Sequence, residues 1–228
     1  MTPTVTIGPH RLFLGDAYET RPMLGFMDVD MFDPPYLIKT SGGGKFRENR
    51  PYLNKISEEG LDKGFDHKII NPLLAGAVVV FCHNDQVPAV SATVDGLFHR
   101  FALCAWRKTN PMPVANKHYV PDIEIYFHAW SRGYEPRGEI AQLKRVFECG
   151  SRSNKDFDHP TVKPDPLMNK IVGNVAGETI CDPFMGSGST GVAAIRAGRI
   201  FTGIEHNPKH FEIAVRRITA AYQERAAA

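Results

Sequence analysis

Residues 179–191 read T-I-C-D-P-F-M-G-S-G-S-T-G, a short apolar strand followed by a glycine-rich turn and the start of a helix. Three glycines, Gly186, Gly188 and Gly191, match the pattern G-x-G-x-x-G, which lets the backbone approach a ligand closely. The helix would offer free N–H groups and a partial positive charge to that ligand. Glu205 closes the next predicted strand, where a carboxylate can bind ribose hydroxyls. The stretch therefore predicts a nucleoside-binding turn in an α/β protein.

The glycine pattern alone leaves its ligand open between NAD, FAD and S-adenosylmethionine (SAM), and a plain tight turn is the structural alternative. A triphosphate-binding loop is disfavoured because no G-K-[S/T] follows. Asp182 and Pro183 precede the first glycine, whereas a dinucleotide fingerprint places its glycine directly after the strand. A carboxylate suits the charged amino group of SAM better than it suits a pyrophosphate. The residues therefore favour SAM.

Segments typical of strands and helices alternate along the chain, which predicts an α/β fold with a mainly parallel sheet covered by helices on both faces. The predicted strands are residues 11–14, 28–32, 77–82, 101–106, 123–128, 179–182 and 199–205. The predicted helices are residues 17–25, 61–75, 86–97, 165–176, 189–197 and 208–225. No helix separates the strands at 101–106 and 123–128, so we expect an antiparallel pair at one end of the sheet.

Composition limits the class of protein. The 228 residues, 43% of them hydrophobic, suit a single domain over residues 1–228. A net charge of +2 requires any nucleic-acid contact to come from local patches. The four cysteines form no C-x-x-C pair, which predicts reduced thiols in a cytoplasmic protein and neither a zinc site nor disulfides. No apolar run approaches the length of a membrane span, so no membrane association is expected.

A second stretch, M-F-D-P-P-Y at residues 31–36, ends a predicted strand on an acid, two prolines and a tyrosine. Proline fixes φ and donates no hydrogen bond, so the strand cannot continue through it. The simple interpretation is a strand end and a turn. The functional interpretation is a rigid tip that presents one carboxylate, free carbonyls and an aromatic face to a flat ligand.

Four motifs occur in one order: D-P-P-Y (33–36), H-P-T-V-K-P (159–164), D-P-F-M-G-S-G-S-T (182–190) and G-I-E-H-N-P (203–208). Together they resemble the amino-methylating DNA methyltransferases of the permuted β group, in which the catalytic motif precedes the SAM-binding motif. The resemblance spans nearly the whole chain. It implies a seven-stranded Rossmann-like sheet, SAM as cofactor and DNA as partner.

The resemblance implies that Asp33, Pro34, Pro35 and Tyr36 form the catalytic tip. The Asp33 carboxylate and the Pro34 carbonyl would accept both hydrogens of an exocyclic amine and stabilise the positive charge that develops on its nitrogen. Tyr36 would stack on the base. A base inside a duplex cannot reach such a tip, so base flipping is expected.

The same resemblance assigns cofactor contacts. Glu205 would hold the ribose, and Asp16 would lie near the adenine of the cofactor. Thr161 and Lys163 would contact the methionine carboxylate, with a solvated surface cation as the alternative for Lys163. The remaining residues expected to bind the cofactor are Asp182, Phe184, Gly186, Gly188, Ser189, Thr190 and Asn207.

Asp33 before P-P-Y resembles the adenine-N6 enzymes of the family, whereas the cytosine-N4 enzymes more often carry serine there. The sequence therefore favours adenine in DNA, with cytosine-N4 or RNA methylation as alternatives. A catalytically silent nucleic-acid-binding subunit is disfavoured by the intact motifs. An NAD-dependent oxidoreductase would leave D-P-P-Y and H-P-T-V-K-P unexplained.

Three segments are candidates for DNA contact: a mobile loop at 37–60, a loop at 107–120 and residues 131–158, a short candidate for target recognition. Lysine and arginine would hold phosphates, and asparagine could read base edges, although for any single residue a solvated loop charge is the better explanation. A homodimer is plausible from the family. The candidate DNA contacts are Lys39, Lys45, Arg47, Arg107, Lys108 and Asn110.

Overall fold

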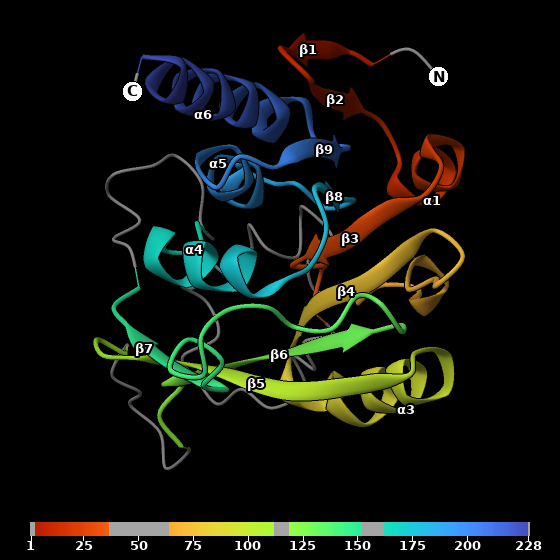
Figure 1. Cartoon of the computed structure of the whole chain (residues 1–228), viewed down its shortest axis with the longest axis vertical. Helices are drawn as coiled ribbons and strands as arrows, with labels where there is room; N and C mark the ends of the chain where they lie inside the picture. Colours follow the sequence, from red (N-terminus) through yellow and green to blue (C-terminus); the bar gives the residue numbers. More distant parts are fainter. Residues whose placement is uncertain (1–2, 37–63, 112–118, 152–161, 228) are drawn as a thin grey trace, which may run out of the picture.

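The computed structural model describes residues 3–36, 64–111, 119–151 and 162–227. The described strands form one sheet in the order β1-β2-β9-β8-β3-β4-β6-β5-β7 (Figure 1). The strands are β1 (Val5–Ile7), β2 (His10–Leu14), β3 (Met27–Phe32), β4 (Ala75–Cys82), β5 (Arg100–Lys108), β6 (Ile123–Trp130), β7 (Val146–Cys149), β8 (Thr179–Asp182) and β9 (Ile200–Glu205). The helices are α1 (Ala17–Thr20), α3 (Val87–Leu97), α4 (Asp165–Asn174), α5 (Ser189–Arg196) and α6 (Pro208–Ala226), with single 3-10 turns η1 (Arg21–Leu24), η2 (His67–Ile69) and η3 (Asn84–Gln86).

The α/β architecture and the mainly parallel sheet centre are confirmed, but the predicted number of strands is wrong. The described sheet has nine strands rather than seven. The two additional strands, β1 and β7, lie at opposite edges and have only three and four residues. Edge strands of this length bury few side chains, so they carry no clear hydrophobic pattern. The antiparallel pair β5 and β6 is confirmed, although β7 continues the sheet beyond it in parallel to β5.

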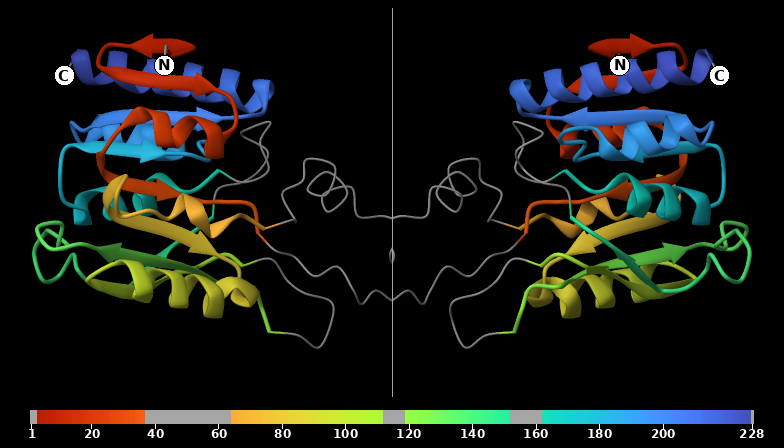
Figure 2. Two further views of the ribbon diagram at one scale, coloured as in Figure 1. Left: turned by 90° about the vertical axis from the view of Figure 1, so that its right-hand side faces the viewer. Right: turned by 90° about the vertical axis from the view of Figure 1, so that its left-hand side faces the viewer.

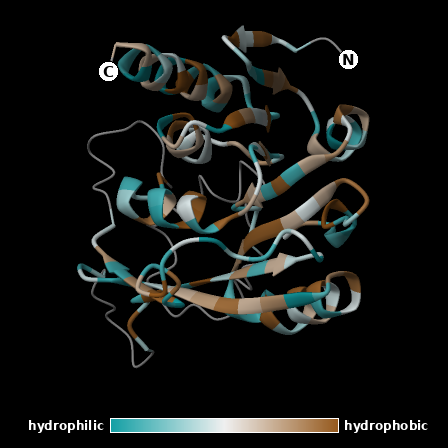
Figure 3. Ribbon diagram, in the orientation of Figure 1, coloured by the Kyte–Doolittle hydropathy of each residue, from teal (hydrophilic) through white to brown (hydrophobic). Residues whose placement is uncertain are grey.

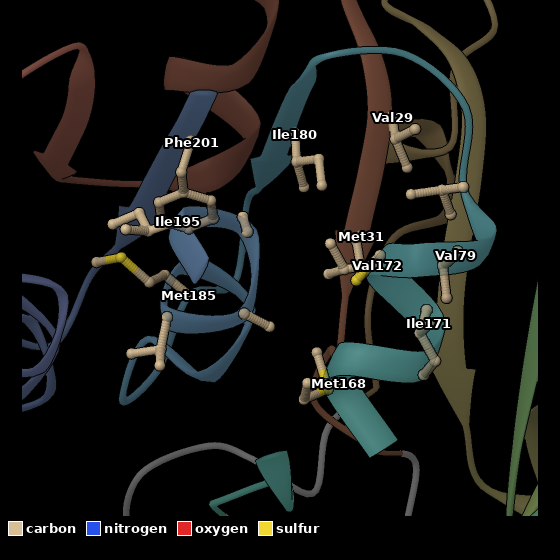
Figure 4. Close-up of a cluster of buried hydrophobic side chains, with 14 of the residues drawn as sticks. Val29, Met31, Val79, Met168, Ile171, Val172, Ile180, Met185, Ile195 and Phe201 are labelled. Carbon is tan, nitrogen blue, oxygen red and sulfur yellow. The ribbon is translucent and has the colours of Figure 1, made fainter. Parts of the chain in front are cut away.

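Both faces of the sheet are covered. Every residue of β4 is buried, and alternate side chains enter two hydrophobic clusters: Val79 and Phe81 enter one, Val78 and Val80 the other. Helices α4, α5 and α6 cover the first face, and α1 and α3 cover the second (Figure 2). Figure 4 shows the first cluster, where Met31 of β3 lies near α4. Helix α6 mixes hydrophobic and hydrophilic residues because only one side of it faces the sheet (Figure 3).

Most predicted helices are confirmed with shifts of one or two residues at their ends. The predicted helix at 17–25 is divided into α1 and η1, with Pro22 in the first turn of η1. The predicted helix at 61–75 is wrong over its described part, which contains the single turn η2 and the first residue of β4. Asp66 caps that turn, and Pro72 follows it, so the segment has no room for a longer helix. None of the described helices has the length and apolar character needed to cross a membrane.

The order of the strands places a switch point at the centre of the sheet. Strands β3 and β8 are parallel neighbours, with Asp30 opposite Cys181. The chain continues from β3 to β4, which lies beside β3 on the side away from β8. It continues from β8 to β9, which lies beside β8 on the side away from β3. In open α/β sheets ligands bind in the crevice outside the carboxyl ends of such strands. Those ends carry D-P-P-Y after β3 and the glycine turn after β8.

Candidate active site

The two motifs meet in one cleft at the carboxyl ends of β3 and β8. Asp33 lines it from one side, and Asp182, Phe184 and Gly186 line it from the other. The cleft contains about 450 Å³ of empty space and is open to solvent. The full lining is Met31, Phe32, Asp33, Phe81, Lys163, Met168, Asp182, Phe184, Met185, Gly186, Ser187, Ser189 and Thr190.

The glycine turn needs its glycines for conformational reasons. Gly186 has φ of 53° and Gly188 has φ of 81°, in the left-handed region that other residues adopt only with strain. Gly188 is also the N-cap of α5, so the helix begins directly at the cleft. The first N–H groups of a helix have no partner within the helix, so such a helix end can bind a polar ligand.

Glu205 fixes the turn from the end of β9. Its Oε2 accepts the N–H of Gly186 at 2.8 Å, and its Oε1 accepts the N–H of Asn207 at 2.8 Å. Burial tends to raise the pKa of Glu205, but the hydrogen bonds that it accepts and the nearby His206 hold its pKa below the ordinary value. The carboxylate is therefore charged and already shapes the backbone around the cleft. Sequence analysis predicted a ribose contact for Glu205, and that contact stays a prediction.

Asp182 is a buried carboxyl at the centre of the cleft, 3% exposed. Burial raises the pKa of Asp182 to about 7, and the negative charges of Asp33 and Glu205 act in the same direction. Hydrogen bonds from the Thr190 hydroxyl and the Phe184 N–H partly oppose this rise. The charges of Asp33 and Glu205 thus oppose ionisation of Asp182, and a cation bound beside Asp182 would relieve that repulsion.

The tip formed by D-P-P-Y, for which a catalytic role is predicted, is held by groups of the chain itself. The Tyr36 hydroxyl donates to Asp33 Oδ1 at 2.7 Å, and the Lys163 ammonium binds Asp33 Oδ2 at 2.5 Å. Behind the tip, the Gln86 amide donates to the Pro35 carbonyl at 3.5 Å. Burial first, and then the charge of Asp33, raise the pKa of Tyr36 well above its usual value, so the hydroxyl stays protonated and can donate. Both oxygens of Asp33 thus have a fixed orientation.

Lys163 is not a solvated cation, so that alternative is wrong. Its side chain is 10% exposed, and its ammonium lies between Asp33 and Glu124, 3.0 Å from Glu124 Oε2. Lys108 binds the other oxygen of Glu124 at 2.7 Å. The four side chains Asp33, Lys163, Glu124 and Lys108 therefore form one alternating chain of charges, called here the Lys163 network. A contact of Lys163 with a cofactor carboxylate stays a prediction.

The other predicted cofactor residues that the structure describes lie close to the cleft as capping groups. Asp16 caps α1 by accepting the N–H groups of Tyr18 and Glu19. The preceding Gly15 N–H donates to the Glu205 carbonyl, which places Asp16 beside the end of β9. Asn207 caps α6 by accepting the N–H of Lys209 at 3.0 Å. Thr161 lies outside the described residues.

Of the predicted DNA contacts, Arg107, Lys108 and Asn110 lie within the described residues. Arg107 pairs with Glu148 at 2.8 Å, and both side chains are about half exposed. Asn110 holds the backbone of Ser151 through hydrogen bonds in both directions. Lys108 belongs to the Lys163 network, with 19% of its side chain exposed. Lys39, Lys45 and Arg47, like the predicted mobile loop at 37–60, lie outside the described residues.

Sequence reasoning missed Glu124 as part of the site. The signal was present, because a single acid in the strand I-E-I-Y-F-H interrupts an apolar pattern. It also missed Ser187, whose carbonyl and hydroxyl accept hydrogen bonds from Arg217 at 2.6 and 3.0 Å. Among the described residues no cluster of three His, Cys, Asp or Glu side chains is arranged to hold a metal ion.

Comparison with solved structures shows the same fold in known methyltransferases. The M1.HpyAVI–SAM complex superposes with a TM-score of 0.64 at 24% identity, covering 90% of this chain and 98% of that one. The PvuII DNA methyltransferase, which is cytosine-N4-specific, superposes with a TM-score of 0.68 at 16% identity, covering 98% of this chain and 94% of that one. At these identities the likeness concerns the fold.

Comparison of sequences identifies the family. The Type II methyltransferase M2.DpnII of Streptococcus pneumoniae is 29% identical over 85% of this chain and 83% of its own length. The model of the N6/N4 methyltransferase family, described as DNA methylases, matches residues 27–216 and so includes D-P-P-Y, the Lys163 network and the glycine turn. The chain belongs to the N6/N4 DNA methylase family.

Proposed function

We propose that this DNA methylase transfers a methyl group from SAM to the N6 amine of adenine in DNA. One observation carries the proposal: the Asp33 carboxylate and the glycine turn after β8 line a single cleft. Methylation of an amine requires a group that accepts an amine hydrogen and a site that holds the methyl donor beside it. The SAM bound in the M1.HpyAVI complex supports the choice of cofactor.

The residues of the cleft fit SAM. Asp33 and Asp182 line the cleft, and the charge of Glu205 acts on Asp182, so the site suits a ligand that carries positive charge. Glu205 would hold the ribose hydroxyls, Asp182 the amino group, and the ring of Phe184 would contact the adenine of the cofactor. When bound, SAM supplies a methyl group activated by its sulfonium. The side chains of this chain position the acceptor amine toward it.

The catalytic tip makes a weak nucleophile reactive. The lone pair of the adenine amine is delocalised into the ring, so the nitrogen must become more tetrahedral to attack. The Asp33 carboxylate and the Pro34 carbonyl would accept its two hydrogens and favour that geometry. Positive charge then develops on the nitrogen, and the fixed carboxylate stabilises it without reorganisation. Tyr36 would stack on the flipped base.

Adenine is preferred over cytosine because an aspartate, rather than a serine, precedes P-P-Y. Arg107 is the described residue that we propose for phosphate contact, since half of its side chain is exposed at the end of β5. Lys39, Lys45, Arg47 and Asn110 stay predictions for the same role. A homodimer also stays a prediction.

The test is to incubate the purified protein with SAM and DNA from a strain that lacks methylases. Nucleosides from the digested DNA are then separated and identified by mass spectrometry. We expect N6-methyldeoxyadenosine, and single-molecule sequencing of the same DNA would give the target sequence. N4-methyldeoxycytidine instead would overturn the choice of base, and methylation of RNA alone would overturn the choice of DNA.

Variants of Asp33 connect that activity to the cleft. Asp33→Ala removes the acceptor, and we expect methyl transfer to fall by at least about a hundredfold, as for loss of a preorganised electrostatic group. SAM binding, measured by calorimetry, should change little. Asp95→Ala, which removes an exposed acid on α3, is the matched control. An Asp33→Ala protein as active as this control would show that the tip is not the site.

A further inference from the structure

Glu124 is a carboxylate placed between two lysines in the interior of the site. It lies on β6, where the adjacent Ile125 packs on the face covered by α3, so Glu124 points to the opposite face. Its Oε1 binds Lys108 at 2.7 Å and its Oε2 lies 3.0 Å from the Lys163 ammonium. Glu124 Oε2 is buried, and among the described residues it has no hydrogen bond of good geometry. Its contact is the ion pair with the Lys163 ammonium.

Glu124 stays charged in this position. Burial tends to raise the pKa of Glu124, but the ammonium groups of Lys163 and Lys108 outweigh burial and hold its pKa below the ordinary value. Burying ion pairs is a poor way to stabilise a fold, because desolvation offsets most of the attraction. Stabilisation of the fold therefore does not explain why a buried glutamate occupies this position. Its place beside D-P-P-Y points to a role in the site.

Lys163 connects Glu124 to Asp33. Its ammonium lies 3.0 Å from Glu124 and binds Asp33 Oδ2, and it lies 4.7 Å from the centre of the Phe81 ring. Burial tends to lower the pKa of Lys163, but the two carboxylates raise it above its ordinary value, so Lys163 stays protonated. A permanent positive charge thus lies directly beside the carboxylate that we propose to stabilise a cationic transition state.

We propose that Glu124 is a positioning residue for methyl transfer and acts through Lys163. It neutralises and holds the ammonium, so that Lys163 can orient Asp33 without opposing the positive charge that develops on the amine nitrogen. This inference rests on the proposed function. Within the Lys163 network the charges balance, with Lys108 and Lys163 against Glu124 and Asp33. Loss of the Glu124 charge leaves one excess positive charge next to the reacting nitrogen.

The first variant to measure is Glu124→Gln, which keeps the shape of the side chain and removes its charge. Single-turnover methylation at saturating SAM and DNA should slow by about tenfold to a hundredfold. The dissociation constant for SAM should stay within about threefold, because Glu124 does not line the cleft. Glu178→Gln is the matched control, since it removes an exposed acid just before the amino end of β8, at the opposite end of the strand from the cleft, and should leave the single-turnover rate unchanged.

A double variant separates charge balance from simple structural support. Lys108→Gln combined with Glu124→Gln restores the balance of one lysine against one aspartate. We expect this double variant to methylate several times faster than Glu124→Gln alone under saturating conditions. A structural role predicts the reverse, because two native contacts are then missing. A double variant no faster than the single variant, or a Glu124→Gln protein as fast as the wild type, would overturn the proposal.

A second readout is independent of activity. Acetic anhydride acetylates unprotonated lysines, and mass spectrometry gives the rate at each position. Loss of Glu124 should lower the pKa of Lys163, so Lys163 should react several times faster in Glu124→Gln than in the wild type at pH 9. Equal rates at Lys163 would overturn the claim that Glu124 holds this ammonium. A wild-type protein that methylates no DNA, whatever the labelling, would instead overturn the proposed function itself.

Discussion

Asp33, directly after β3, and Asp182, the last residue of the neighbouring β8, present their carboxylates to the same cleft. The charge of Asp33 disfavours the charged form of Asp182: after burial, it is among the causes that raise the pKa of Asp182 to about 7. A cofactor with positive charge resolves this conflict. The crowded carboxylates therefore lower the stability of the cofactor-free protein, and binding of the cofactor can offset this loss.

The affinity for SAM should consequently depend on pH. A cation favours the charged form of Asp182, so binding releases a proton from this group whenever the pH lies below its pKa. We expect the dissociation constant to rise by about tenfold for each unit that the pH falls below 7, and to be level above about pH 8. Titration calorimetry from pH 5.5 to 8.5 measures this. Asp182→Asn should bind weakly and without that slope, and a level wild-type profile would contradict the prediction.

The same Asp182 carboxyl should make the cofactor-free protein less stable as the pH rises, whereas it makes SAM binding tighter. Its pKa in the folded protein, about 7, lies above the ordinary 3.8. Its contribution to stability is therefore fully present below about pH 4 and is lost as the pH rises through 7. Asp182→Asn removes this loss, so at pH 8 the cofactor-free variant should have a free energy of unfolding about 1–3 kcal/mol higher than the wild type. Urea unfolding should show the difference shrinking at pH 5; a variant less stable at pH 8 would refute this.

The local motifs of the site could be predicted because they follow from backbone rules. Gly186 and Gly188 lie in the turn that their spacing predicts, and both have a positive φ. The two prolines after Asp33 end β3 as expected. The neighbours of Lys163 could not be predicted, because Asp33 and Glu124 are distant in sequence and meet it only through the order of β3, β4 and β6. The edge strands β1 and β7 were missed because their short, half-exposed sequences carry no clear period.

The glycine turn gives a prediction about stability. A Cβ at Gly188 would lie 3.1 Å from the Cβ and 3.2 Å from the Cα of Ala214, and 3.1 Å from Ile218 Cδ1. The backbone of α6 cannot easily move away from such a Cβ. Alanine is also disfavoured at the φ of 81° that Gly188 adopts. Gly188→Ala should therefore lower the free energy of unfolding by about 2–4 kcal/mol and weaken SAM binding.

The matched control is Gly173→Ala in α4, where a Cβ would meet nothing within 4 Å. This glycine is exposed within a helix, so the substitution should raise the free energy of unfolding by about 0.5–1 kcal/mol. Urea unfolding of both variants measures the contrast. Equal effects at the two positions would show that the turn tolerates a side chain.

Variants of Tyr36 distinguish the roles of its ring and its hydroxyl. The hydroxyl orients Asp33 Oδ1, which Lys163 also restrains through the other oxygen, whereas the proposed stacking on the base depends on the ring alone. Tyr36→Phe should therefore lower kcat/KM for DNA by less than about fivefold, the effect of one hydrogen bond. Tyr36→Ala should lower it by about tenfold to a hundredfold, the contribution of one stacked base.

Fluorescence of a duplex with 2-aminopurine at the methylated position provides the complementary measurement. An unstacked 2-aminopurine is bright, and stacking on an aromatic ring quenches it. With Tyr36→Ala we expect a brighter signal than with the wild type or Tyr36→Phe, because the flipped base then lacks its stacking partner. If Tyr36→Phe instead matched Tyr36→Ala in both rate and fluorescence, the hydroxyl bound to Asp33 rather than the ring would be the essential part of this residue.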